Sequence, residues 1–395
     1  MDVRPQFPVP RAARRAGFSL VELLVSVVVG LLALMFATRL IVSAEQNKAT
    51  SLGGSDAMQN GMLALFSLNG DAAQSGWGLN DDLITGCNSI FSDTAGFALA
   101  PATRGGAAIT PLAPVVIESN GANSDRISFY TGSSASAVGS VKLLANYAGG
   151  PALTSDTNAA FGFADGDVIV VAPEPAGGNC ALAQLAGAPV GAQLNITPGA
   201  AYRYNRAGGL GNNYGPGQAR IFNLGPGAKL ALHSWSVNRG ILLLRSSDLA
   251  GSSAQPVSVI DNVVAIKAQY GFETRAIANY SPSRNGMQVG QWSGPMIDAD
   301  GDGVVGGAGD FLRVAAVRLA VVARSKSAEK PNAASGQCTA STAKPVLFSS
   351  QAPATVPAAP VTVEVAVAGD PLDWKCYRYR VFEAIVPIRN AEWRP

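Results

Sequence analysis

An acidic side chain near the start of a long apolar run has the clearest chemical role in this sequence. From Phe18 to Thr38 the only ionisable side chain is Glu22, and the residues before Phe18 are rich in arginine. As a helix this run spans roughly 31 Å, about the thickness of a bilayer core. A carboxylate there costs on the order of 2.5–3.5 kcal/mol on insertion scales, so Glu22 needs a partner.

Cleavage after Gly17 supplies that partner. A secretory signal is cut after its apolar region, whereas Gly17 lies before the apolar run. A cut at Gly17 leaves the helix on the mature chain and frees the amine of Phe18. Within one chain Glu22 reaches this amine poorly, but between staggered subunits Glu22 of one copy can meet the amine of the next. The pattern therefore predicts ordered assembly.

The segment from Gly17 to Leu24, GFSLVELL, resembles the processing and assembly motif of type IV prepilins and type II secretion pseudopilins. The resemblance implies that a prepilin peptidase cuts after Gly17 and methylates the amine of Phe18. It also implies that Glu22 pairs with that amine during assembly. An ordinary signal anchor with a chance glutamate is the alternative.

Later segments resemble the PilW-like minor pilins of the type IV pilus, in the same order along the chain: 124–130, 166–171, 263–271, 314–319 and 382–390. The resemblance implies a structural subunit in the priming and tip complex, with roles in pilus assembly, twitching motility or cell adhesion. Its implied partners are other minor pilins, the major pilin, the prepilin peptidase and a PilY-type tip adhesin. A type II secretion minor pseudopilin is the alternative, which the long exported body disfavours.

Charge predicts the orientation of the chain. The leader carries four arginines against Asp2, and positive charge beside a first membrane segment stays in the cytoplasm. We expect a single pass through the bacterial inner membrane, with everything after Val42 in the periplasm and later on the pilus surface. The whole chain has 29 basic and 27 acidic residues; without residues 1–17 these become 25 and 26. A nearly neutral body does not indicate nucleic-acid binding.

Cysteine usage fits an exported, oxidising location. Cys87, Cys180, Cys338 and Cys376 allow three pairings. We favour Cys87 with Cys180 and Cys338 with Cys376, because nearest-neighbour pairing keeps each bridge within one segment. Free buried thiols are the alternative. A structural zinc site is not expected, since no C-x-x-C pair occurs and the chain has one histidine.

A short acidic loop is the best candidate for a cofactor, and the cofactor would be calcium. Asp298, Asp300 and Asp302 alternate with small residues, as in a calcium-binding loop. The bidentate glutamate of an EF-hand is missing, and Asp310 comes one residue late, so the site would be a bent loop between strands. The alternative is an ordinary acidic turn.

Two other features suggest chemistry less strongly. His233 lies in an apparent strand, and a Ser/His/Asp hydrolase would use it as base, but no G-x-S-x-G elbow accompanies it. We therefore expect a structural strand histidine and no enzyme. The tyrosines 202, 204 and 214 could stack on sugars or bases, or pack their loop onto the domain.

The elements that position these residues predict an α+β, pilin-like fold, in which a long N-terminal helix packs on an antiparallel β-sheet domain with long loops. We expect a cytoplasmic leader (1–17), a membrane and assembly helix (18–42), its amphipathic continuation (43–75) and an exported β-rich domain (76–395). Gly53-Gly54 predicts a kink or break. The stripe Met58, Met62, Leu65 and Phe66 is predicted to be core.

Short apolar runs between turn signals predict the strands of the exported domain. They are 126–130, 167–172, 230–237, 241–245, 263–272, 313–323 and 377–388. Asn238-Arg239-Gly240 predicts a tight hairpin. Residues 183–218 and 325–360 are rich in Gly, Ala, Pro, Ser and Asn and predict long surface loops.

Overall fold

The structure of the protein is a computed structural model that describes residues 19–134, 139–158 and 161–392. For residues 45–53 and 391–392 it describes the backbone alone. The chain divides into two compact units, with the boundary between Leu52 and Gly53. Gly17 and Phe18 lie outside the described residues, so the predicted cleavage site has no structural counterpart here.

Helix α1 (Leu20–Gln74) contributes to both units. In the first unit, Leu20–Ala44 has a mean hydropathy of 2.6 and is exposed throughout, so it is long and apolar enough to cross a membrane. The helix is continuous through Gly53-Gly54, so the break predicted there is wrong. A helical glycine costs only about 1 kcal/mol relative to alanine, which the helical turns on both sides can offset.

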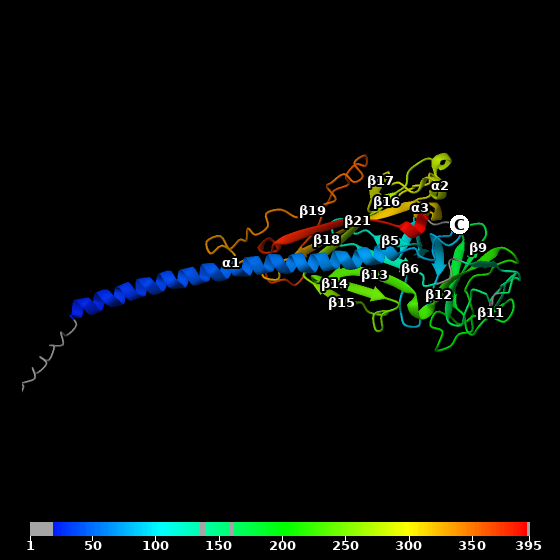
Figure 1. The fold of residues 1–395 in the computed structure, drawn as a ribbon, viewed down its shortest axis with the longest axis horizontal. Coiled ribbons are helices and arrows are strands. Elements are labelled where there is room, and N and C mark those ends of the chain that lie inside the picture. The colour runs from blue at the N-terminus through cyan, green and yellow to red at the C-terminus, as the bar shows by residue number, and fades with distance from the viewer. Residues whose placement is uncertain (1–18, 135–138, 159–160, 393–395) are drawn as a thin grey trace, which may run out of the picture. The chain divides into compact units, whose positions relative to one another are not determined.

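The second unit contains three larger sheets, shown in Figure 1. The six-stranded sheet has the order β4 (Pro111–Leu112), β1 (Cys87–Ile90), β10 (Asn179–Gln184), β9 (Asp167–Pro173), β12 (Ala219–Pro226) and β7 (Ser140–Lys142). The five-stranded sheet has the order β15 (Val257–Asp261), β14 (Ile241–Ser246), β13 (Ala231–Asn238), β6 (Arg126–Thr131) and β5 (Val115–Glu118). The four-stranded sheet has the order β17 (Gln291–Ser293), β16 (Val263–Phe272), β18 (Val314–Arg324) and β21 (Tyr379–Pro387).

Smaller elements complete the second unit. Three two-stranded sheets pair β2 (Ala102–Arg104) with β3 (Ala107–Ile109), β8 (Ala152–Thr154) with β11 (Gln193–Asn195), and β19 (Val346–Leu347) with β20 (Val361–Thr362). The short helices are α2 (Pro282–Asn285), α3 (Ala308–Leu312), α4 (Arg389–Glu392), η1 (Gly227–Lys229), η2 (Ile277–Asn279) and η3 (Trp374–Cys376). Among the described strands β1 and β10 pair in parallel, and the other pairs are antiparallel. The α+β, mostly antiparallel prediction is confirmed.

All seven predicted strands are present, as β6, β9, β13, β14, β16, β18 and β21. The hairpin predicted between β13 and β14 is also present, since Asn238 pairs with Ile241 across a two-residue turn. Arg239 and Gly240 both have positive φ, 49° and 75°, as a type I′ turn requires.

The second half of α1 packs on the sheets mainly through small residues. Of the core stripe predicted for it, Leu65 packs against the core, and the prediction is wrong for the other three residues. Ala57, Ala64, Leu68 and Ala72 are buried, and a Cβ on Gly61 would overlap the ring of Phe382 on β21. Small side chains let the helix approach β21 closely, and Figure 1 shows the two elements side by side. On the opposite face are Met58, Met62 and Phe66, with exposed fractions of 50%, 57% and 75%.

The two predicted long loops are partly structured. The first contains β11, and Tyr204 and Tyr214 are buried within it. The second contains β19 and the buried Phe348. These apolar groups join the larger cores, so neither segment is a plain surface loop.

Both favoured disulfides are present in the second unit. Cys87 on β1 bonds to Cys180 on β10, and Cys338 bonds to Cys376. The first bridge joins two neighbouring strands of the six-stranded sheet. The second joins residues 38 apart in the chain, and on the chain-entropy model a loop of that size contributes about 4 kcal/mol.

Candidate functional site

The amino-terminal turn of α1 holds the candidate assembly residue. Leu23 donates a backbone hydrogen bond to the carbonyl of Ser19, which places Glu22 in the first turn of the helix. The amide groups at a helix N-terminus favour a nearby negative charge. The Glu22 side chain is exposed within the single chain, so it is available to a group from another subunit.

A histidine held between two carboxylates fixes the second half of α1 to the five-stranded sheet. His233 Nδ1 lies 2.8 Å from Asp71 Oδ2 on α1, and Nε2 lies 2.9 Å from Asp248 Oδ1. Trp235 Nε1 donates to the same oxygen of Asp71 at 2.6 Å. With both ring nitrogens occupied by carboxylates, His233 has no position left for a serine nucleophile. Sequence reasoning expected a structural strand histidine but did not find Asp71 and Asp248.

The electrostatics of this cluster favour a charged imidazole. Burial by itself lowers the pKa of His233, but the hydrogen bonds that its ring donates to Asp248 and Asp71 outweigh burial and raise that pKa to about 9. At Asp248, burial raises the pKa, and the bonds from His233 and Ser246 overcome this and lower it to about 2. Both shifts report the same ion pair, which is therefore intact at neutral pH.

The His233 cluster predicts a loss of stability in mild alkali. Because the folded-state pKa of about 9 lies above the ordinary 6.5, the stabilisation is complete below pH 6.5 and disappears as the pH rises through 9. We expect a loss of about 2–3 kcal/mol in the free energy of unfolding across this window. His233→Gln should flatten this dependence, measured by denaturant unfolding of the full-length protein in detergent. An equally steep dependence in the variant would contradict the assignment.

The structure brings three of the four predicted calcium ligands together. Carboxylate oxygens of Asp298, Asp300 and Asp302 lie within 4.8 Å of one another. Burial and the neighbouring charges of Asp302 and Asp298 raise the pKa of Asp300. The arrangement requires glycine at position 309, because a Cβ on Gly309 would overlap the carboxylate of Asp300.

The structure gives the fourth residue, Asp310, a different set of partners. Its Oδ1 accepts hydrogen bonds from the amides of Ala299 and Asp300, at 2.6 and 3.3 Å. Its Oδ2 accepts from the amides of Gly306 and Gly307, at 2.8 and 3.1 Å. Asp310 is fully buried. It therefore holds the acidic loop in shape from within.

Calcium binding at this loop remains a prediction. We expect millimolar calcium, but not magnesium, to raise the unfolding temperature of the full-length protein, with a Kd on the order of 10⁻⁴–10⁻³ M. The variant Asp300→Asn should abolish the shift because it removes one of three converging charges. A matched Asp165→Asn variant, away from the loop, should retain it. No calcium-specific shift in the unaltered protein would contradict the prediction.

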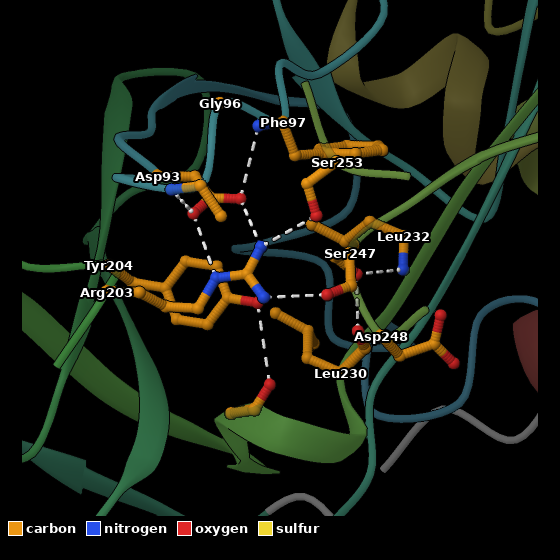
Figure 2. Close-up of polar contacts among 12 residues, drawn as sticks. Asp93, Gly96, Phe97, Arg203, Tyr204, Leu230, Leu232, Ser247, Asp248 and Ser253 are labelled. Carbon is orange, nitrogen blue, oxygen red and sulfur yellow. Dashed lines mark hydrogen bonds and ion pairs between the residues drawn. The ribbon is translucent and has the colours of Figure 1, made fainter. Parts of the chain in front are cut away.

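An ion pair anchors the first predicted long loop, as Figure 2 shows. Arg203 donates from Nε and Nη2 to the two carboxylate oxygens of Asp93, at 2.9 and 2.5 Å. It also reaches the carbonyl of Ser247 and the hydroxyl of Ser253, at 2.7 and 3.1 Å. The hydrogen bonds that Arg203 donates to Asp93 raise the pKa of Arg203. The buried Tyr204 ring lies beneath its guanidinium, so this part of the loop is a packing element and not a stacking platform.

A buried ion pair that sequence reasoning missed links the β5–β6 connection to β16. Lys267 on β16 binds a carboxylate oxygen of Asp125, and the two side chains are 3% and 0% exposed. The lysine also donates to the carbonyls of Gly121 and Asn123, at 2.8 and 3.1 Å. All three ammonium hydrogens thus have acceptors. The sequence held one signal of this pair: Lys267 interrupts the apolar run of β16, and a buried lysine needs a partner.

Comparison with known protein families supports an assembly role. Residues 234–390 match the family model described as Type IV Pilus-assembly protein W. Residues 12–38 match the prokaryotic N-terminal methylation motif. Searches of curated proteins and of solved structures return no similar protein. The two matches support a pilin-like role in pilus assembly. Residues 234–390 are thus similar to the type IV pilus-assembly protein W family, and residues 12–38 are similar to the methylation motif of prepilin-like proteins.

Proposed function

We propose that this protein is a minor pilin that joins the priming and tip complex of a type IV pilus after prepilin-peptidase cleavage and N-methylation. The proposal rests on one combination of observations: the family matches at 12–38 and 234–390, and an apolar helix that bears a single carboxylate. The amino-terminal motif alone also fits a type II secretion minor pseudopilin, which remains the alternative. The match at 234–390 favours the pilus.

The proposed maturation begins with hydrolysis of the peptide bond between Gly17 and Phe18. This step releases the leader and converts the Phe18 nitrogen from an amide into a basic amine, which a methyl donor then modifies. The apolar helix remains attached to the exported domain. Before cleavage the Phe18 nitrogen is a neutral amide, so in our proposal Glu22 gains this partner only after processing.

The proposed assembly step pairs Glu22 with the methylated amine of a neighbouring subunit. A lone carboxylate in the bilayer is unfavourable, and removal of one partner from a buried ion pair is strongly destabilising. The pair therefore favours a fixed axial offset between adjacent helices. The site is exposed in the single chain and complete only between two chains.

The exposed face of α1 supports lateral association of the second unit as well. Met58, Met62, Leu63 and Phe66 are each at least half exposed. An exposed apolar patch of this kind on an exported domain is typical of a surface that another subunit covers. In our proposal the helices of other minor pilins and of the major pilin cover it.

The proposed location follows the maturation pathway. The unprocessed chain is a single-pass protein of the bacterial inner membrane with its sheets in the periplasm, where the prepilin peptidase and the other minor pilins meet it. The assembled protein is at the pilus tip on the cell surface, and a PilY-type adhesin is its proposed neighbour there. Nucleic acid is not among the proposed partners.

Deletion of the gene tests the proposed function against its alternative. We expect a large drop in surface fibres counted by electron microscopy, with normal secretion of folded exoproteins measured in the same cultures. Restoration of the gene should restore the fibres. Normal fibres together with failed secretion would replace the proposal with the pseudopilin alternative, and normal levels of both would contradict each.

A further inference from the structure

The last strand of the four-stranded sheet, β21, is a long edge strand. It pairs with β18 from Tyr379 to Pro387 in unbroken register, and no strand among the described residues pairs with its other side. It has nine residues, whereas the other outer strands of the three larger sheets have two to five. Natural proteins usually shorten, bulge or cover such an edge.

Two hydrogen bonds show which backbone groups face the open side. The amide of Ile388 donates to the carbonyl of Ala315, and the amide of Ser325 donates to the carbonyl of Arg378, at 2.9 and 2.8 Å. With the unbroken register, these bonds direct the even-numbered residues of β21 toward β18, because pairing alternates along antiparallel strands. The free amides therefore belong to Tyr379, Val381, Glu383 and Ile385. Pro387 has no amide and ends the row.

The side chains along this edge form a narrow apolar strip. Val381 and Ile385 are 39% and 43% exposed, and they lie on the same face because side chains alternate along a strand. Glu383 between them is already engaged by Arg318 Nη2 at 3.0 Å and by the amide of Phe348 at 2.7 Å. The strip therefore offers no free carboxylate of its own.

The charged groups beside the strip are cationic. Arg380 and Arg389 are exposed, and within the described part of the chain neither makes an ion pair. Arg378 at the start of the strand is 53% exposed and pairs with Glu329. A backbone that extends along this edge would thus meet free amides and carbonyls in its middle and positive charge at both ends.

We propose that β21 takes up an extended strand from a neighbouring pilus-assembly subunit. The row of free amides and carbonyls selects an extended backbone, the apolar strip selects apolar side chains opposite Val381 and Ile385, and the flanking arginines select acidic residues at the strand ends. The inference rests on the proposed function, because the neighbour is supplied by assembly.

Proline at an outward position tests the hydrogen-bonding row without removing a bond to β18. In the full-length protein in its native host, Ile385→Pro should reduce co-purification with pilus-assembly subunits about tenfold, equivalent to about 1.4 kcal/mol. Ile385→Thr keeps the amide and should reduce it by less than about threefold, since it loses only apolar contact. Equal effects of the two variants, at normal protein levels, would overturn the proposal.

A photo-crosslinking residue covers the case in which the proline variant fails to fold. Placed at Val381 or at Ile385, it should join the same segment of one pilus-assembly subunit, at partner residues about four apart, as two paired strands require. The same residue at Val259 on the edge of β15 should not. No crosslink from β21, or one from all three positions, would overturn the proposal. If Glu22→Ala abolishes fibres while Ile385→Pro and the crosslinks have no effect, this inference fails and the proposed function stands.

Discussion

Replacement of Glu22 by alanine should abolish most surface fibres while the protein remains in the membrane. The substitution favours membrane insertion of the single chain but disfavours the contact between subunits. Removal of the carboxylate favours insertion by about 2.5–3.5 kcal/mol, but it leaves the methylated amine of the neighbouring subunit without a partner. Each 1.4 kcal/mol lost from a subunit contact weakens association about tenfold. We therefore expect a reduction in fibres of at least about tenfold.

The membrane fraction and the fibre count must be measured in the same cells. Glu22→Gln should behave like the alanine variant, because it preserves size and polarity but not charge. Ser26→Ala is a matched control, since Ser26 lies one turn further along the exposed helix and its hydroxyl bonds only to the carbonyl of Leu23. Normal fibres in the glutamine variant would show that the charge of Glu22 is not what assembly requires.

Removal of the carboxylate of Asp125 should be among the most damaging single changes to the exported domain. Asp125→Ala leaves the ammonium of Lys267 buried and uncompensated, which costs about 3–5 kcal/mol. Typical domains have 5–15 kcal/mol of stability in total, so the variant should also accumulate poorly. Denaturant unfolding of the full-length protein in detergent measures the difference.

Two further variants test whether the unpaired buried charge of Lys267 causes the loss of stability. The double variant Asp125→Ala, Lys267→Met should recover much of the loss, because it removes both charges from the interior. Arg126→Ala breaks a surface pair with Glu118, whose partners are 54% and 24% exposed, and should cost less than about 1 kcal/mol. A loss below about 1 kcal/mol for Asp125→Ala would contradict the assignment.

Local sequence patterns predicted the strands and the hairpin well, because alternation and turn residues act over a few positions. Arg239-Gly240 specifies its turn through backbone conformations that few residues adopt. The favoured disulfides were also correct, although Cys87 and Cys180 are 93 residues apart. The first bridge is not local, because the chain between its cysteines also contributes β5 and β6 to the five-stranded sheet. The nearest-neighbour rule nevertheless gave both pairs.

The face of α1 that packs on the sheets was predicted correctly for Leu65 alone, and the reason for the error at the other three positions is identifiable. Met58, Met62 and Phe66 have helical spacing and large apolar side chains, which normally marks the core. The structure buries Ala64 and Leu68 instead. The second half of α1 has two apolar faces: one packs on its own domain, and in our proposal the exposed one contacts other subunits. Apolar periodicity identifies both faces, but it does not show which face packs on the sheets of the same chain.

Apart from the disulfides, contacts between distant side chains could not be predicted from the sequence. Asp71 and His233 are 162 residues apart, and Lys267 and Asp125 are 142 apart. Each side chain is unremarkable in its own segment, and only the packing of helix and sheets brings the partners together. The acidic loop is the contrasting case, because Asp298, Asp300 and Asp302 are close in sequence and their proximity was predicted.

The most direct test of the account is the mass of the amino-terminal peptide of this protein, isolated from its native host. The account predicts a mature chain that begins at Phe18 and carries a methyl group on its nitrogen. The variant Gly17→Val should retain the leader and assemble no fibres. A wild-type chain that begins at Met1 with an intact leader would contradict the account, because Glu22 would then have no amine to pair with.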